Sequence, residues 1–144
     1  MSTKPKTMEL KFTRTIPATP AEVFGAWMDP EHPGNPWSGS KKVILDARVD
    51  GLFYFATSKE TSWPHYGRFV ELERNRRARY AWMSPFTRGL ESMVTVTFEK
   101  QGEETLLTLT HEGLPDDDYG RLHEEGWNDC LGLFVEQFSP RRKR

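Results

Sequence analysis

Four histidines have the most versatile chemistry in this 144-residue chain: His32, His65, His111 and His123. An imidazole titrates near neutral pH and can act as an acid, a base or a metal ligand. The chain contains no His-x-x-x-His pair, and its single cysteine, Cys130, has no partner nearby in the sequence. The sequence therefore predicts no metal site and no cofactor.

Two of these histidines could meet inside the protein. His111 ends a predicted strand whose alternate residues face inward, and His123 shares one face of the last predicted helix with Trp127. Both side chains would then reach the space between sheet and helix. The pattern favours hydrogen-bonded core histidines, and a catalytic acid or base is the alternative.

Other side chains could supply an acid, a base or an anion contact: Glu71, Tyr66, His65, Glu112 and Arg48. A shift of one residue in strand register would turn each of them to the opposite face, so periodicity alone does not place them inside. The stretch 38–41 has the Ser-x-x-Lys spelling of some acyl-transfer enzymes, but it falls in a loop. No catalytic signature is present, and the sequence leaves binding and turnover both open.

Five tryptophans are the most unusual feature of the composition. Trp27 and Trp127 fall on helical stripes, which indicates core positions. Trp37 follows a proline-rich loop and Trp63 precedes a proline, so we expect both at the rim of a pocket, whereas Trp82 lies on an inward strand face. Large aromatic rings with one polar N–H suit a flat or apolar ligand, and plain packing is the alternative.

Alternating apolar residues between short turns predict seven strands, at 10–16, 42–49, 52–58, 66–72, 79–83, 93–99 and 105–111. Short connections between them favour an antiparallel meander. The side chains expected on its inner face are Phe53, Phe55, Tyr80, Trp82, Val94, Val96, Phe98, Leu107, Leu109 and His111.

Helices are expected after the first strand and at the end of the chain. Thr19, Pro20 and Glu22 form a capping-box pattern for one short helix, and Asp29 to Glu31 repeat the pattern for a second. A long helix over 116–138 carries one apolar stripe. Gly126 within it indicates either close packing on the sheet or space left for a ligand.

These elements predict an α+β fold of the helix-grip kind, in which a curved antiparallel sheet of about seven strands wraps on the long C-terminal helix. We expect a single domain over 9–138, a disordered lead-in over 1–8 and a basic tail over 139–144. The candidate cavity residues are Trp37, Phe53, Phe55, Trp63, His65, Tyr66, Tyr80, Trp82, Val94, Val96, Leu109, His111, His123, Trp127 and Cys130.

Charge and composition narrow the class of partner. Twenty basic residues stand against 21 acidic ones, a formal net charge of -1, so the basic excess of a nucleic-acid binder is missing. No apolar run approaches the ~20 residues of a membrane helix. A single cysteine and an N-terminus without a secretory pattern favour the cytoplasm.

Four parts of the chain carry a resemblance to a known family: 14–18 with 20–30, then 46–55, then 67–72 with 80–82, and finally 94–98 with 105–113 and 126–127. Together they resemble the activator of heat-shock protein 90 ATPase homologue family, within the START-like (SRPBCC) superfamily that includes the birch-pollen-allergen fold. The family usually has Gly-Gly where this chain has Asp50-Gly51.

The resemblance implies a helix-grip fold whose cavity often takes an apolar or amphipathic small molecule. It implies no fixed reaction, because members include binders, enzymes and chaperone regulators. We therefore expect a small hydrophobic ligand, with an enzyme acting on a small aromatic or polyketide-like substrate and a protein-interaction module as alternatives. The eukaryotic co-chaperone has an additional N-terminal domain, which argues against direct chaperone activation here. An uncovered edge strand could pair two copies into a homodimer.

Overall fold

The structure is a computed structural model that describes residues 6–38, 40, 42–58 and 62–138. Its elements are, in chain order, β1 (Thr7–Ile16), α1 (Pro20–Trp27), β2 (Val43–Leu45), β3 (Leu52–Ser58), β4 (Ser62–Glu73), β5 (Arg77–Trp82), the 3-10 turn η1 (Pro85–Thr87), β6 (Ser92–Gln101), β7 (Glu104–Pro115) and α2 (Asp118–Glu136).

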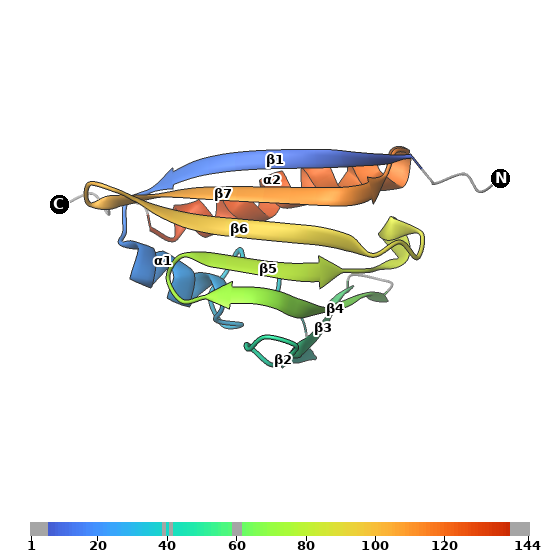
Figure 1. Cartoon of the computed structure of the whole chain (residues 1–144), viewed down its shortest axis with the longest axis horizontal. Coiled ribbons are helices and arrows are strands. Elements are labelled where there is room, and N and C mark those ends of the chain that lie inside the picture. Colours follow the sequence, from blue (N-terminus) through green and yellow to red (C-terminus); the bar gives the residue numbers. More distant parts are fainter. Residues whose placement is uncertain (1–5, 39, 41, 59–61, 139–144) are drawn as a thin grey trace.

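All seven strands form one antiparallel sheet in the order β1-β7-β6-β5-β4-β3-β2. The meander from β2 to β7 pairs each strand with the next, and β1 then adds to the free edge of β7. The long helix α2 lies behind β1 and β7 on the inner side of the curved sheet (Figure 1). The predicted helix-grip fold is confirmed.

The core lies between this sheet and the two helices. All ten residues predicted to face inward are buried. From α1 they meet Val23 and Trp27, and from α2 they meet Trp127, Leu131 and Phe134. Alternation along each strand therefore places one aromatic-rich layer on the inner face, as the period of two requires.

The first helix is capped as predicted. The Thr19 hydroxyl accepts a hydrogen bond from the Glu22 backbone N–H at 3.2 Å, and the Thr19 N–H donates to the Glu22 carboxylate at 3.0 Å. Two backbone donors that a helix start leaves free are thereby satisfied.

The second short helix is a wrong prediction, because residues 28–38 form turns. Three prolines in seven residues, at positions 30, 33 and 36, remove backbone donors that a helix needs. The Asn35 side chain instead donates to the carbonyls of Ala26 (2.8 Å) and Asp29 (2.7 Å). It thereby ties this turn segment to the end of α1.

Several boundaries also differ from expectation. β1 begins at Thr7, so the last two residues of the predicted lead-in are strand, while 1–5 and 139–144 lie outside the described residues. β2 ends at Leu45 rather than at 49, because 46–51 fold into a tight loop in which Asp50 has φ 68°. β4 begins earlier than predicted and includes Trp63 and His65.

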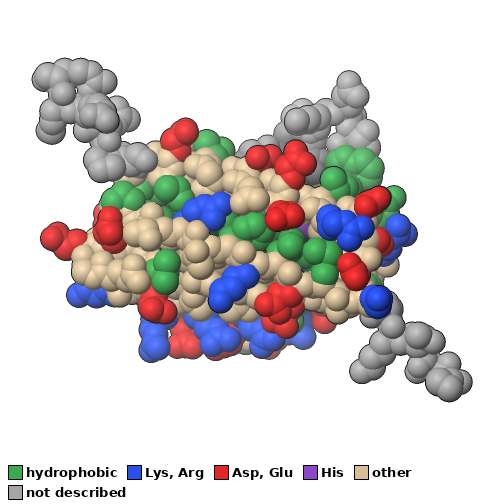
Figure 2. All heavy atoms as spheres, turned by 90° about the horizontal axis from the view of Figure 1, so that it is seen from above, with side chains coloured by type: hydrophobic (Ala, Val, Ile, Leu, Met, Phe, Trp, Pro, Cys, Tyr) green, Lys and Arg blue, Asp and Glu red, His purple; other side chains and the backbone are tan. Residues whose placement is uncertain are grey.

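The surface carries both signs of charge. On the face seen from above, acidic and basic side chains are interspersed with hydrophobic ones (Figure 2). Within the described residues, no helix combines the length and apolarity needed to cross a bilayer.

Candidate ligand-binding pocket

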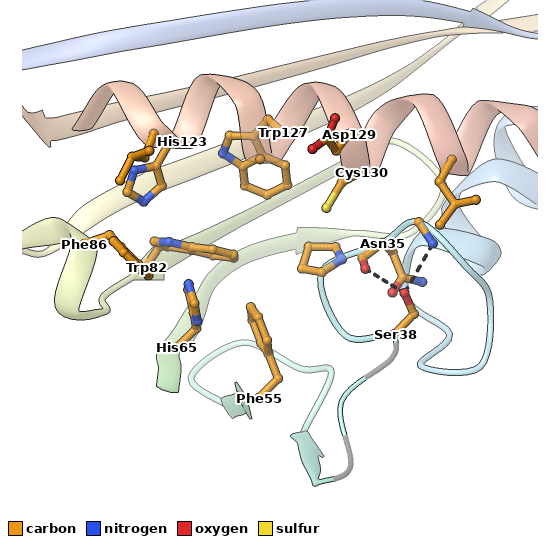
Figure 3. A pocket seen from close by; sticks show the side chains of 15 residues that line it. Asn35, Ser38, Phe55, His65, Trp82, Phe86, His123, Trp127, Asp129 and Cys130 are labelled. Carbon is orange, nitrogen blue, oxygen red and sulfur yellow. Dashed lines mark hydrogen bonds between the residues drawn. The ribbon is translucent and has the colours of Figure 1, made fainter. Parts of the chain in front are cut away.

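A pocket of about 580 Å3 lies between α2 and the sheet (Figure 3). Its volume falls in the usual range for small-molecule sites, roughly 300–1,000 Å3. The lining residues come from α2, from β3, β4 and β5, from η1 and from the turn segment 28–38. They are Gly34, Asn35, Pro36, Ser38, Phe55, His65, Trp82, Phe86, Leu122, His123, Gly126, Trp127, Asp129, Cys130 and Leu133.

The helical period of α2 supplies one wall. His123, Trp127 and Cys130 succeed each other at spacings of four and three residues, so they share the face turned to the sheet. Leu122 and Leu133 flank this face and are 50% and 45% exposed, which places them at the rim.

Gly126 is an exposed residue of α2 that lines the pocket. A Cβ built on Gly126 would meet no atom within 4 Å, so close packing of helix on sheet is not what its size provides. Of the two interpretations left open by the sequence, the structure favours space facing the pocket.

Aromatic rings make the facing wall. The ring of His65 stacks on Phe55 with centroids 4.8 Å apart and planes at 8°. The ring centroid of Trp82 lies 5.5 Å from that of Phe55 and 5.3 Å from that of Trp127. Flat rings stacked or tilted against one another in this way offer a rigid apolar surface.

The turn segment 28–38 closes a further side, and its polar groups are already paired. The Ser38 hydroxyl donates to the Asn35 carbonyl at 3.0 Å and accepts from the Gly34 N–H at 3.2 Å. Asn35 Oδ1 accepts from the Trp37 N–H at 3.1 Å. These side chains therefore shape the wall, and Lys41 of the Ser-x-x-Lys stretch lies outside the described residues.

His111 lies directly behind the pocket wall and is fully hydrogen-bonded. The Ser92 hydroxyl donates its only proton to the Trp82 carbonyl (2.7 Å), so it must accept from His111 Nε2–H (2.8 Å). His111 Nδ1 in turn accepts from Trp127 Nε1–H at 2.9 Å. This assigns a neutral Nε2–H tautomer, and burial holds the pKa of His111 well below 6.5.

His65 and His123 have the opposite tautomer and line the pocket. Their Nδ1–H groups donate to the carbonyls of Trp63 (2.9 Å) and Tyr119 (3.1 Å). Each Nε2 therefore carries a lone pair. Burial lowers the pKa of His65 to about 4 and also lowers that of His123, so both rings are neutral at pH 7.

Two buried polar atoms of the pocket residues have no hydrogen-bond partner among the described groups. They are Trp82 Nε1, a donor, and His123 Nε2, an acceptor. Buried polar atoms are nearly always paired, because an unpaired one loses its hydration without compensation. This end of the pocket is therefore chemically incomplete.

Cys130 does not behave as a nucleophile. Burial raises the pKa of its thiol to about 11, and the neighbouring carboxylate of Asp129 raises it further. The reactive species of cysteine is the thiolate, which is scarce at neutral pH when the pKa is this high.

The structure brings six of the fifteen predicted residues to the pocket: Phe55, His65, Trp82, His123, Trp127 and Cys130. Seven others are buried but do not line it. They are Trp37, Phe53, Tyr80, Val94, Val96, Leu109 and His111. Trp63 and Tyr66 are 41% and 46% exposed and do not line it either.

Trp37 and Tyr66 differ most from expectation. Trp37 is fully buried rather than at a rim, because its Nε1–H donates to the Trp27 carbonyl at 2.7 Å and its ring packs 5.1 Å from Phe53. Tyr66 faces outward because its neighbour His65 faces inward. Glu71, another candidate acid or base, forms an ion pair with Arg77 instead.

Sequence reasoning missed Phe86 and the rim residues of α2. Phe86 sits in η1, where the Ser84 hydroxyl accepts from its N–H at 3.0 Å, and its ring lies 6.5 Å from His123. The Ser-Pro-Phe-Thr stretch was a readable capping signal. Leu122 and Leu133 could also have been predicted from the sequence, since they lie four residues before and seven residues after Gly126 on one helix face.

Within the described residues, no group of three His, Cys, Asp or Glu side chains could hold a metal ion. What the geometry presents is an apolar pocket with neutral imidazoles, whose described polar groups include the unpaired donor Trp82 Nε1 and the acceptors His65 Nε2 and His123 Nε2. A curved sheet gripping a long C-terminal helix, with such a pocket between them, defines a START-like helix-grip protein.

Comparison with known proteins identifies the family. Residues 17–138 match the family described as activator of Hsp90 ATPase homolog 1-like protein, and the chain belongs to this family. No curated protein sequence matches the chain.

Solved structures share the fold. A protein from Chromobacterium violaceum is 22% identical with a TM-score of 0.77, covering 92% of this chain and 98% of its own. An HSP90 activator from Plasmodium falciparum is 22% identical with a TM-score of 0.71, covering 87% and 91%. The Aha1 dimer from Colwellia psychrerythraea is 14% identical with a TM-score of 0.72, covering 91% and 96%. At these identities the likeness shows the fold alone.

Proposed function

We propose that this protein binds a small apolar or amphipathic molecule in the pocket between α2 and the sheet. The observation that carries the proposal is a 580 Å3 pocket with aromatic walls at whose end two buried polar atoms lack partners. A filled hydrophobic core would have left no space of this volume.

Native mass spectrometry of the purified protein, followed by denaturation, is the first test. A stoichiometric small molecule released on denaturation would name the ligand's chemical class. Whatever that result, titration with the neutral fluorescent probe N-phenyl-1-naphthylamine then measures binding to the emptied protein.

Gly126→Leu is the variant that blocks the pocket. Leucine at this position projects into open space within the pocket and suits a helix, so the fold should persist. We expect the affinity for the probe to fall at least about tenfold, since filling the site removes the apolar contacts.

Gly132→Leu is the matched control. Gly132 lies on the same helix, also has no atom within 4 Å of a built Cβ, and does not line the pocket. Its leucine variant should bind the probe as the wild type does. Equal affinity in both leucine variants would contradict the proposed site.

A chaperone-regulating role is the second candidate, and the family match together with the fold of the Plasmodium falciparum HSP90 activator favours it. The test is the ATPase rate of an Hsp90 titrated with this protein. Acceleration that persists in Gly126→Leu would assign the activity to a surface rather than to the pocket.

Turnover within the pocket could use His65, His123 or the carboxylate of Asp129, which all line it. Of the candidate acids and bases from the sequence, His111 has both nitrogens occupied, and Glu71 and Tyr66 do not line the pocket. Loss of turnover in His123→Gln, measured on the ligand found by mass spectrometry, would support an enzyme.

A homodimer is a separate prediction. The outermost strands of the sheet are β1 and β2, and an outer strand can pair with a second copy. Light scattering across a concentration series measures the mass directly, and a constant monomer mass would contradict the dimer.

A further inference from the structure

The polar end of the pocket, defined here as Trp82, His123 and His65, has a specific hydrogen-bonding pattern. His65 reaches it from β4 and His123 from α2, with Trp82 and Phe86 between them (Figure 3). The His65 and Trp82 rings are 5.3 Å apart, and Phe86 lies 6.2 Å from His65 and 6.5 Å from His123.

Two buried unpaired atoms at this end are complementary in kind. Trp82 Nε1–H can only donate, and Trp82 is 5% exposed. His123 Nε2 can only accept, because its Nδ1–H is committed to the Tyr119 carbonyl, and His123 is 9% exposed. Both atoms are closed off by the side chains around them, so a ligand group reaches them once these side chains shift, and to satisfy both it must accept one hydrogen bond and donate another.

The charge at this end excludes an anion. A carboxylate only accepts, so it would bring a negative charge against the His123 lone pair. Among the fifteen lining residues none is Lys or Arg, and the one charged member is Asp129. A carboxylate that left water to bind here would therefore have no compensating cation beside it.

We propose that the polar end recognises an uncharged hydroxyl group on an aromatic or similarly apolar ligand. The hydroxyl accepts from Trp82 Nε1–H and donates to His123 Nε2, while the ring of the ligand packs between Phe55, Trp82 and Trp127. This inference rests on the proposed binding function and specifies the ligand class of the same site.

Three matched probes test it: 2-naphthol, naphthalene and 2-naphthoate, each competed against N-phenyl-1-naphthylamine at pH 7.5. We expect 2-naphthol to bind at least about tenfold more tightly than naphthalene, because it satisfies two otherwise unpaired groups. We expect 2-naphthoate to bind no more tightly than naphthalene.

The outcomes separate the two proposals. Equal affinities for naphthol and naphthalene would overturn the hydroxyl site and leave pocket binding intact. A water molecule that already satisfies the polar end would give this result. Tighter binding of naphthoate would overturn it as well. Failure of all probes, including N-phenyl-1-naphthylamine, would overturn pocket binding itself.

Two variants of His123 assign the preference to this residue. His123→Phe removes the acceptor and should reduce the naphthol-to-naphthalene affinity ratio to about one while naphthalene still binds. His123→Gln keeps an acceptor oxygen and should retain part of the ratio. An unchanged ratio in His123→Phe would contradict the assignment, and retained naphthalene binding shows that the variant has folded.

Discussion

At the scale of single residues, His111 shows how a chemically versatile side chain becomes structural. Its two ring nitrogens join Ser92 on β6 to Trp127 on α2, so the sheet and the helix are linked by hydrogen bonds inside the core. Both partners are buried, and each would be left incomplete without it.

His111→Phe should therefore destabilise the protein by about 2–4 kcal/mol, because Trp127 Nε1–H loses its acceptor and Ser92 loses a donor. Urea denaturation followed by tryptophan fluorescence measures the free energy of unfolding.

The double variant His111→Phe/Trp127→Phe removes both ends of one hydrogen bond. Its cost should be smaller than the sum of the two single costs, since no unpaired N–H remains. Additive costs would contradict the hydrogen-bonded role.

Cys130 offers a second prediction at this scale. Because its thiol pKa is raised to about 11 and it is the only cysteine, alkylation by iodoacetamide at pH 7.5 should be at least about tenfold slower than in the urea-unfolded chain. A bound pocket ligand should slow it further. A rate equal to that of the unfolded chain would contradict both the burial and the raised pKa.

At the scale of elements, the docking of the turn segment 28–38 on α2 shapes one wall of the pocket. Gly34 has φ +95°, and a Cβ there would come within 2.3 Å of the Phe134 backbone nitrogen. Glycine is needed at this position for two reasons, the left-handed backbone and the close approach.

Gly34→Ala should destabilise the protein by about 2–4 kcal/mol, combining backbone strain with overpacking against α2. Gly89→Ala is the matched control, because Gly89 has φ +81° but no atom within 4 Å of a built Cβ. It should cost about 1–2 kcal/mol, from the backbone alone. Equal losses in urea denaturation would show that the approach to α2 contributes nothing.

At the scale of the whole molecule, three buried neutral histidines make folding depend on pH. The pKa values of His65, His111 and His123 all lie below 6.5 in the folded state, mainly through burial. As the pH falls, the unfolded chain therefore takes up protons before the folded chain does.

The free energy of unfolding should thus be nearly constant above about pH 7.5 and decrease as the pH falls through 6.5 toward 4. Each histidine contributes a slope of up to about 1.4 kcal/mol per pH unit. Urea denaturation between pH 5 and 6.5 isolates this effect from the carboxylates, which titrate lower.

His65→Phe keeps the stacking on Phe55. Because it removes one titrating imidazole, it should reduce that slope by up to about 1.4 kcal/mol per pH unit. A slope equal to that of the wild type would contradict a depressed pKa for His65.

The sequence by itself determined the sheet, the capping of α1, the long C-terminal helix and the inner strand faces. Local signals carry these features: the period of two, the Thr19 to Glu22 capping box and the apolar stripe of α2. The same reasoning predicted a helix after Asp29, because it read the capping pattern there without the Asn35 side chain that holds the segment in turns.

Only the tertiary structure decided which inward residues face empty space and which fill the core. Periodicity places Trp37 beside a loop, Tyr80 on the same face as Trp82, and His111 opposite His123, but it does not say where the helix stands away from the sheet. That depends on the approach of Gly34 to Phe134, on the space beside Gly126, and on the ring of Phe86 from η1. Such contacts join distant parts of the chain, so their chemistry appears only when the fold has set the distances.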